Sequence, residues 1–405
     1  MARAWVYDRS GTKKYEAAVA KAKTTGRKPP SRWEVMYYDQ SGSLRTEVAR
    51  NKRTAEARCS DLEVSLSSGS YVDPVEGKVS FSTVAERWID SRHDLKPQTW
   101  WKYRALLDNH VNERWGDQPL VKIDHEEIST WVARLLKSKD EGGSGLGASQ
   151  ARHCYRVLAM VLEWCVPKRL PRNPARGVKL PIRPESEHVY LSYEQIERLA
   201  SASAGLVTKY KVPTAGAAIN RALILLLAYT GMRWGEAAAL RIGKVDLKNR
   251  RIRVVSTFTE INGVQCEGLP KNGKPRTVPI PASLVPVLRE VVGNRGDDQL
   301  VFRTARKQSL RANNWRVREF NAAVKAAGLG DLGLTPHKLR HTAASLAIAA
   351  GADVKVLQQM LGHATAAMTL DIYGHLFPDR LDEVATKLDR NRTKALRRSA
   401  RDDAA

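Results

Sequence analysis

A small set of residues in the C-terminal half has the types and spacing that chemistry on a phosphate group requires. Arg233 lies three residues before Glu236, so the two side chains share one face if the segment is helical. Such an arginine is either ion-paired for structure alone or held by the carboxylate so that it grips a phosphate with two nitrogens. Taken alone, this pair leaves both interpretations open.

Lys271 precedes Asn272-Gly273, a dipeptide that strongly favours a tight turn, and is therefore predicted at the tip of a β-hairpin. A lysine in a turn is usually no more than solvated. Only its neighbours in the folded chain would give Lys271 a role in chemistry.

A third group lies at the predicted start of a helix, where Thr335 is suited to the N-cap and Pro336 to the first helical position. His337 and Arg340 then fall in the first turn. The N-terminal end of a helix attracts anions, so one phosphate would meet an imidazole, a guanidinium and the helix dipole together. His341 is about 100° around the helix from Arg340 and is predicted to be structural.

Two further segments follow in the chain. Leu361-Gly362-His363 closes a predicted helix, and Tyr373 comes ten residues after His363 in a short segment, DIYGH. A tyrosine in such a place would by itself be a packing residue.

Together these segments resemble the active-site set of the tyrosine recombinase (phage integrase) family, which they match in this order: Arg233, Lys271, His337, Arg340, His363 and Tyr373. The similarity is dense in TGMRWGEAAAL, HKLRHTAASLAIAAG, LQQMLGH and MTLDIYGH, and extends over about residues 193–377. The resemblance implies an α+β, mostly α-helical protein. A small strand-rich N-terminal module, a helical core-binding domain and a mixed α/β catalytic domain are expected.

By this resemblance, Tyr373 attacks a DNA phosphodiester and forms a 3′-phosphotyrosyl link, with no metal and no other cofactor. Arg233 and Arg340 would clamp the nonbridging oxygens, where negative charge grows in the transition state. Lys271 would give a proton to the departing 5′ oxygen. Because the link conserves the bond energy, another 5′-hydroxyl can reverse the step without ATP.

The resemblance also implies roles for the remaining polar groups of the set. His337 is expected to take the proton of the tyrosine, and His363 to donate a hydrogen bond to the phosphate. Glu236 would orient this set of groups. Lys338 stands where family members usually carry Asp, and we predict that it faces a DNA phosphate, together with the DNA-binding residues Lys274 and Arg276.

The composition agrees with a polyanionic partner. Lys and Arg number 67 against 43 acidic residues, a formal net charge of +24, and nucleic acid is the commonest partner for such a surplus. The cysteines form no CxxC pair, which argues against a zinc cluster or a disulfide framework. The start of the chain lacks the apolar core of a signal peptide, and the longest apolar run, residues 222–229, is too short for a membrane span. A cytoplasmic protein without membrane contact is expected.

Hydrophobic periodicity and turn residues predict the elements that must position these groups. Strands are expected at residues 4–7, 33–38, 44–49, 252–258, 264–266 and 277–280. Helices are expected at residues 52–66, 81–91, 96–115, 124–136 and 149–166, with further helices in the catalytic part. The chain then divides into an arm-type DNA-binding module (1–75), a helical, SAM-like core-binding domain (79–170), a linker (171–190), a catalytic domain (191–390) and a basic C-terminal tail (391–405).

The function expected from these observations is that of a site-specific DNA recombinase, an integrase of a phage or mobile element. Its expected partners are double-stranded attachment sites of core and arm type, three further copies of itself on DNA, a DNA-bending host factor and an excision factor. A type IB topoisomerase-like enzyme shares the chemistry and is the nearest alternative. A DNA-binding regulator on a recombinase fold is the alternative from another class, which the complete active-site set disfavours.

Overall fold

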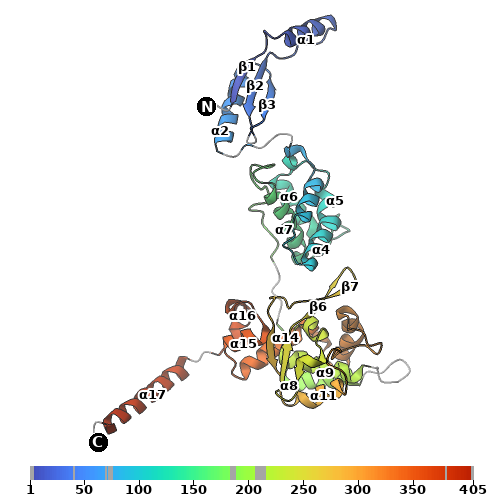
Figure 1. Ribbon diagram of the computed structural model, residues 1–405, viewed down its shortest axis with the longest axis vertical. Helices are drawn as coiled ribbons and strands as arrows, with labels where there is room; N and C mark the ends of the chain where they lie inside the picture. The colour runs from blue at the N-terminus through green and yellow to red at the C-terminus, as the bar shows by residue number, and fades with distance from the viewer. Residues whose placement is uncertain are drawn as a thin grey trace. The chain divides into compact units, whose positions relative to one another are not determined.

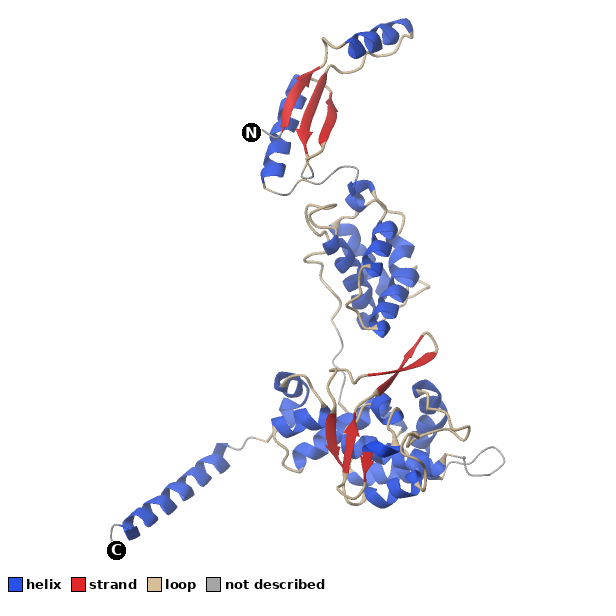
Figure 2. Ribbon diagram, viewed as in Figure 1, coloured by secondary structure: helices blue, strands red, loops and turns tan. Residues whose placement is uncertain are grey.

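The computed structural model describes residues 4–39, 42–68, 71, 76–182, 188–205, 216–378 and 381–402, in two units, Met1–Glu185 and Ser186–Ala405. Helices predominate, and the strands are short (Figures 1 and 2). The prediction of an α+β, mostly α-helical protein is confirmed. The linker predicted at residues 171–190 lies partly outside the described residues.

The first unit begins with an antiparallel sheet whose strands are, in spatial order, β1 (Ala4–Asp8), β2 (Trp33–Tyr38) and β3 (Leu44–Ala49). Side chains alternate between the two faces of a strand, and Val35 and Tyr37 turn inward. They pack with Leu62 of α2 (Lys52–Ser67), which covers this face of the sheet. The strands and the helix predicted for this module are confirmed.

One helix of the module was not predicted: α1 (Lys13–Thr24), in the connection between β1 and β2. The hydroxyl of Thr12 caps it by accepting a hydrogen bond from the backbone N–H of Tyr15. Ala22 is the only buried residue of α1. The segment therefore lacks the apolar stripe by which a helix is recognised in a sequence.

The rest of the first unit is a set of helices around a separate core: α3 (Phe81–Asp90), α4 (Pro97–Leu106), α5 (Asn112–Trp115), α6 (His125–Leu136) and α7 (Ala148–Trp164). Trp88, Trp115 and Leu158 are fully buried in this core. The carboxylate of Asp124 accepts the backbone N–H of Glu127 and starts α6 at the predicted place. These four predicted helices agree with the structure, the second of them as α4 and α5 joined by a single π-turn.

The second unit is organised around α9 (Ala217–Thr230), which is buried on nearly all sides, as expected for a helix that is apolar all round. It packs against α8 (Tyr193–Ala204), α11 (Leu284–Val292) and α14 (Pro336–Ala349). The further helices are α10 (Trp234–Ala238), α12 (Ala312–Trp315), α13 (Asn321–Ala326), α15 (Val354–Leu361), α16 (Ala366–Tyr373) and α17 (Leu381–Asp402).

Its strands form a sheet of β4 (Val245–Asp246), β5 (Arg251–Val254) and β8 (Arg276–Pro279), and a hairpin of β6 (Thr257–Ile261) and β7 (Val264–Gly268). The single strand predicted at residues 252–258 is wrong, because β5 and β6 belong to different sheets. The hairpin predicted around Asn272 is also wrong. The hairpin turn is Asn262-Gly263, where both residues have positive φ, as a two-residue turn with right-handed strand twist requires.

Lys271 consequently lies in the connection between β7 and β8. These two strands belong to different sheets, because β7 pairs with β6 and β8 pairs with β5. Gly273 there has φ of +70°, and its N–H bonds to the carbonyl of Pro270 at 2.7 Å. A turn therefore exists at the predicted dipeptide, but in a loop rather than at a hairpin tip.

Candidate active site

The carboxylate of Glu236 is the anchor of the site. It is 1% exposed, and its Oε2 accepts the backbone N–H of Arg233 at 2.9 Å while its Oε1 accepts the guanidinium of the same residue at 3.0 Å. The guanidinium of Arg276 binds both carboxylate oxygens, at 2.9 and 2.6 Å. Burial alone would raise the pKa of Glu236, but the bonds and charges of the two arginines hold it below its ordinary value.

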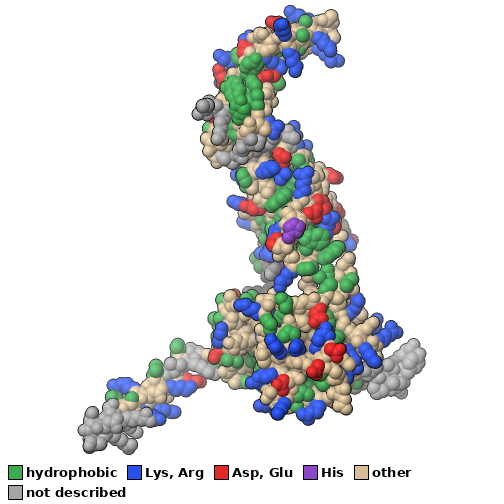
Figure 3. All heavy atoms as spheres, viewed as in Figure 1, with side chains coloured by type: hydrophobic (Ala, Val, Ile, Leu, Met, Phe, Trp, Pro, Cys, Tyr) green, Lys and Arg blue, Asp and Glu red, His purple; other side chains and the backbone are tan. Residues whose placement is uncertain are grey.

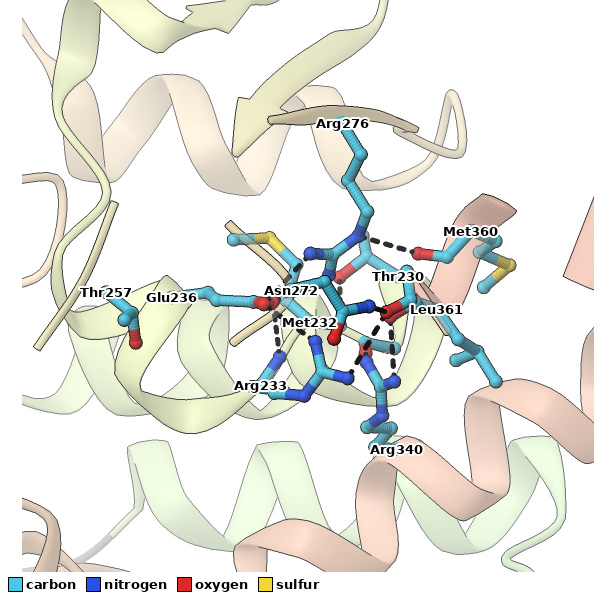
Figure 4. A network of polar contacts seen from close by, with 12 residues as sticks. Thr230, Met232, Arg233, Glu236, Thr257, Asn272, Arg276, Arg340, Met360 and Leu361 are labelled. Atoms are coloured by element: carbon cyan, nitrogen blue, oxygen red, sulfur yellow. Dashed lines mark hydrogen bonds and ion pairs between the residues drawn. The ribbon is translucent and has the colours of Figure 1, made fainter. Parts of the chain in front are cut away.

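The last carbonyls of α15 receive donors from four side chains (Figure 4). Arg276 Nε reaches the carbonyl of Met360 at 3.1 Å, and Arg340 reaches that of Leu361 at 2.7 Å. The carbonyl of Gly362 accepts Asn272 at 2.6 Å and Arg233 at 3.4 Å. Because the C-terminal end of a helix carries partial negative charge, these carbonyls offset a dense group of cations.

Glycine is required where the helix ends meet the arginines. Gly231, after α9, has φ of +64°, and a Cβ there would lie 2.7 Å from a methyl group of Leu361. Its carbonyl accepts a second bond from Arg340, at 2.5 Å. Arg340 is 3% exposed, and burial together with the charge of Arg233 lowers its pKa. The segment Thr230–Arg233 thus places the C-terminal end of α9 next to Arg340.

The hydroxyl of Tyr373 lies at the end of α16, with the side chain 1% exposed against Ala344 and Leu357. Burial raises its pKa to about 12, although the charge of Arg340 opposes the rise. The hydroxyl oxygen is 2.9 Å from Nδ1 of His341. A phenol with such a pKa loses its proton only to a base within reach.

His341 was predicted to be structural, and the structure shows a contact to Tyr373 that the sequence did not predict. The imidazole of His341 contacts the hydroxyl of Tyr373. The ring of His337 packs edge-on against the ring of His341, with centroids 5.2 Å apart. Among the described contacts none joins His337 to Tyr373. His337 and His341 are four residues apart on α14 and therefore share a face, a spacing that was available in the sequence.

Three imidazoles near Tyr373 share a lowered pKa. Burial, followed by the charges of neighbouring groups, lowers the pKa of His341 to about 4 and that of His363 to about 4, and it lowers that of His337 as well. The ring of His363 is parallel to that of Tyr373, with centroids 6.4 Å apart, and its Nδ1 is 3.0 Å from the hydroxyl of Thr369. All three are therefore neutral near pH 7.

The predicted cations have different surroundings. The charge of Lys271 contributes to the lowered pKa of His337, which brings this lysine to the cluster. Lys274 lines a pocket of about 580 Å³ beside Arg233. Lys338 Nζ lies 3.3 Å from the carbonyl of Leu332.

The DNA contact expected of Arg276 stays a prediction. Its side chain is 11% exposed, and its three nitrogens all donate within the protein, two of them to Glu236 and one to the carbonyl of Met360. A guanidinium held in this way joins Glu236 to the end of α15. In the part of the chain that the structure describes, no group of three His, Cys, Asp or Glu side chains is placed to hold a metal ion, and no helix is long and apolar enough to cross a membrane.

Known proteins share both the sequence and the fold of this chain. The phage integrase family matches residues 190–380, and the N-terminal SAM-like domain of phage integrases matches residues 80–136. The tyrosine recombinase XerC of Roseiflexus sp. is 30% identical over 72% of this chain and 87% of its own length. The ICEBs1 integrase of Bacillus subtilis is 24% identical over 77% of this chain and 83% of its own.

Solved structures give the same fold. The Tn1549 transposon integrase, in complex with a circular intermediate DNA, superposes with a TM-score of 0.62 at 21% identity, over 77% of this chain and 99% of that one. The sequence relatives are recombinases and integrases, so neither the topoisomerase nor the regulator alternative is favoured. The chain belongs to the phage integrase family of tyrosine recombinases, and it is a site-specific recombinase that cleaves and rejoins DNA.

Proposed function

We propose that the chain is the integrase of a phage or integrative element and that Tyr373 is its nucleophile. The observation that carries this proposal is the hydroxyl of Tyr373, which is hydrogen-bonded to the neutral imidazole of His341 and lies in the electrostatic field of Arg340 and Arg233. The hydroxyl attacks a DNA phosphorus atom, so that a bond from phosphorus to the tyrosine oxygen forms and the bond to the 5′ oxygen breaks. The product is a 3′-phosphotyrosyl link and a free 5′-hydroxyl.

Arg233 and Arg340 bind the nonbridging oxygens of the phosphate. Both guanidiniums already donate to carbonyls at the end of α15. Phosphate oxygens are stronger acceptors than carbonyls, because charge-assisted hydrogen bonds are about twice as strong as neutral ones. DNA therefore takes the place of the carbonyls of Leu361 and Gly362, with Glu236 holding Arg233 in position. His363 and His337 stand beside this phosphate as hydrogen-bond donors, and Lys338 and Lys274 contact neighbouring phosphates.

We assign the proton of Tyr373 to His341 rather than to His337. We expect His341→Ala to slow single-turnover cleavage about 100- to 10,000-fold, the range for loss of a general base. His341→Asn is the matched variant, because its amide keeps a hydrogen bond near the position of Nδ1 but takes no proton. Both variants should bind DNA normally and cleave slowly. Cleavage by His341→Ala at the wild-type rate, with a large defect in His337→Ala, would restore the original assignment.

The pH dependence of cleavage follows from the same group. A base with a pKa of about 4 is unprotonated at neutral pH and becomes protonated only as the pH falls through about 4. Wild-type single-turnover cleavage should therefore persist on acidification from pH 7 to about pH 5 and decline below that. A half-loss of the rate near pH 6.5, the value of an ordinary imidazole, would contradict a buried neutral acceptor.

Lys271 is proposed as the general acid for the departing 5′ oxygen. Lys271→Ala should cleave ordinary DNA slowly, yet cleave well when sulfur replaces the 5′ bridging oxygen, because a thiolate leaves without a proton. The measurement is the single-turnover cleavage rate of each substrate with the wild-type protein and with the variant. Equal defects on both substrates would show that Lys271 acts by binding, and the acid would then be sought at Lys274.

We further propose that residues 1–75 bind arm-type sites, residues 79–170 bind the core site, residues 171–190 are a linker, residues 191–390 are the catalytic domain, and residues 391–405 are a basic tail. Separate apolar cores in the first unit support this division. Deleting residues 1–75 should abolish integration and spare cleavage of a short core-site duplex. Integration by the truncated protein at the wild-type rate would disprove the arm assignment.

The active assembly is proposed to be a tetramer on two DNA duplexes. In support, α17 carries the exposed apolar side chains of Leu381, Leu388 and Leu396, suited to docking on a neighbouring copy. A lambda integrase of the same fold has been solved as a tetramer bound to a Holliday junction, with a TM-score of 0.51. A chain that binds an arm site and a core site at the same time requires the DNA between them to bend, so we propose that a DNA-bending host protein takes part. We also propose an excision factor for the reverse reaction. The reaction takes place in the host cytoplasm, where that DNA lies.

A further inference from the structure

The positive charge of the N-terminal module is unevenly distributed. Four of its arginines are neutralised by carboxylates at 2.5 to 2.8 Å, in the pairs Arg9–Glu34, Arg32–Asp8, Arg45–Asp39 and Arg58–Glu47. These pairs use four of the six acidic residues found in residues 1–58. The net charge that attracts a polyanion must therefore lie elsewhere in the module.

Most of the net positive charge of the N-terminal module lies on α1 and the loop that follows it. Within residues 13–28 the chain has six cations and one acid, Glu16, the cations being Lys13, Lys14, Lys21, Lys23, Arg27 and Lys28. All six are exposed, and none forms an ion pair with another described residue. Figure 3 shows these basic side chains gathered around α1.

The sheet itself offers no such charge on its open face. The face opposite α2 carries apolar and aromatic side chains from all three strands, among them Trp5, Tyr7, Met36, Tyr38, Leu44 and Val48. The strands place neither lysine nor arginine on this face. Figure 3 shows it as a hydrophobic surface. The face is suited to apolar contact, and the contacts with phosphates must come from another element.

The sequence of α1 is poorly explained by stability. Lys13 and Lys14 occupy the first turn, where the positive end of the helix dipole disfavours cations. Ala22 is its only buried residue, and among the described residues the one hydrogen bond from a side chain of α1 to residues 25–32 is that of the Tyr15 hydroxyl to the carbonyl of Pro30, at 3.3 Å. Residues that disfavour the local structure and gain no contact within the protein are expected at functional sites, where a binding partner supplies a favourable contact.

We propose that α1 and residues 25–28 form a clamp for the sugar-phosphate backbone of duplex DNA, one that binds phosphates without reading base sequence. Lys14 and Lys21 are seven residues apart and so lie on one face of the helix. Ala17 and Ala18 lie between them, and their small side chains let the helix axis come close to the duplex. The inference rests on the proposed arm-binding function and adds the element that supplies its electrostatic affinity.

The test compares two variants of the full chain that lose the same charge. One carries Lys13→Ala, Lys14→Ala, Lys21→Ala and Lys23→Ala, and the matched control carries Lys387→Ala, Arg390→Ala, Arg392→Ala and Lys394→Ala in α17. The probe is a fluorescent duplex of about 40 base pairs and arbitrary sequence, titrated from about 50 to about 300 mM salt.

Each phosphate contact adds about 0.9 to the slope of log affinity against log salt. The α1 variant, with four lysines removed, should therefore lose up to about 3.6 from this slope and bind at least about tenfold more weakly at 150 mM salt, while the control stays close to wild type. An α1 variant with the wild-type slope overturns the clamp. Equal losses in both variants overturn it too, because total charge rather than α1 would then determine affinity.

A second variant guards against misfolding of the first. Strands β1 and β2 are antiparallel neighbours with Asp8 opposite Trp33, so their pairing does not depend on residues 13–28, which can be replaced by Asn-Gly. This variant should keep its thermal transition, lose from its circular dichroism only the helical signal of α1, and lose at least as much slope as the first variant; a wild-type slope overturns the clamp. Covalent adduct formation on attachment-site DNA is measured alongside. Its failure in the wild-type protein would count against the proposed function, whereas the salt slopes decide the clamp independently.

Discussion

A Tyr373→Phe protein is expected to bind DNA like wild type and to form no covalent link with it. The change removes one oxygen and keeps the ring that packs against Ala344 and Leu357. Nδ1 of His341 loses its partner, at a stability cost of about 1 to 3 kcal/mol, which should leave the fold intact. No positioned nucleophile remains. Gel shifts measure binding, and denaturing gels of a labelled duplex measure the adduct.

The other tyrosines of the second unit provide the control. Tyr190 lies near His375, its hydroxyl 3.2 Å from Nε2, and Tyr193 stacks on Tyr229. Phenylalanine at each of these three positions should leave adduct formation close to wild type. A Tyr373→Phe protein that still formed an adduct would transfer the nucleophile to one of them.

Loss of Arg340 is expected to impair both cleavage and stability. Its guanidinium donates to the carbonyls of Gly231 and Leu361 and is proposed to bind the phosphate. Arg340→Ala should slow cleavage about 100- to 1,000-fold, as loss of one donor to a developing negative charge does elsewhere. It should also lower stability by about 1 to 3 kcal/mol for each carbonyl left without a partner. Single-turnover cleavage and urea unfolding measure the two effects.

A variant of Arg295 separates the loss of stability from the loss of catalysis, because this arginine also donates to backbone carbonyls but lies outside the candidate active site. Its guanidinium donates to four backbone carbonyls, those of Val291, Val292, Leu300 and Val301. Arg295→Ala should destabilise the protein at least as much and, at a temperature where it stays folded, cleave like wild type. Equal loss of cleavage in both variants would reduce Arg340 to a structural role.

Most elements and the family followed from the sequence because each depends on local chemistry or on the order of residues in the chain. Asp124 caps a helix through its own backbone neighbourhood, and the strands of the N-terminal sheet are rich in aromatic and β-branched residues. The order from Arg233 to Tyr373 is a property of the sequence itself. Such features need no knowledge of distant contacts.

Other features depend on partners far away in the chain. The dipeptides at Asn262 and Asn272 give the same turn signal, and only the pairing of β6 with β7 decides which one makes the hairpin. The burial of Arg276 depends on its ion pair with Glu236, forty residues earlier, and could not be predicted from its neighbours in the sequence. α1 was missed because it is charged and barely packed, the features proposed to serve DNA.

The link between the protein and DNA through Tyr373 is the claim on which the rest depends. The most direct measurement incubates wild-type protein with a nicked attachment-site duplex, in EDTA and without ATP, and identifies the DNA-bearing peptide by mass spectrometry. The account predicts a nucleotide 3′-phosphate on Tyr373, in the peptide containing Asp371-Ile372-Tyr373-Gly374. A 5′-phosphate link, a link to any other residue, or an adduct that forms only when metal ions are supplied would contradict it.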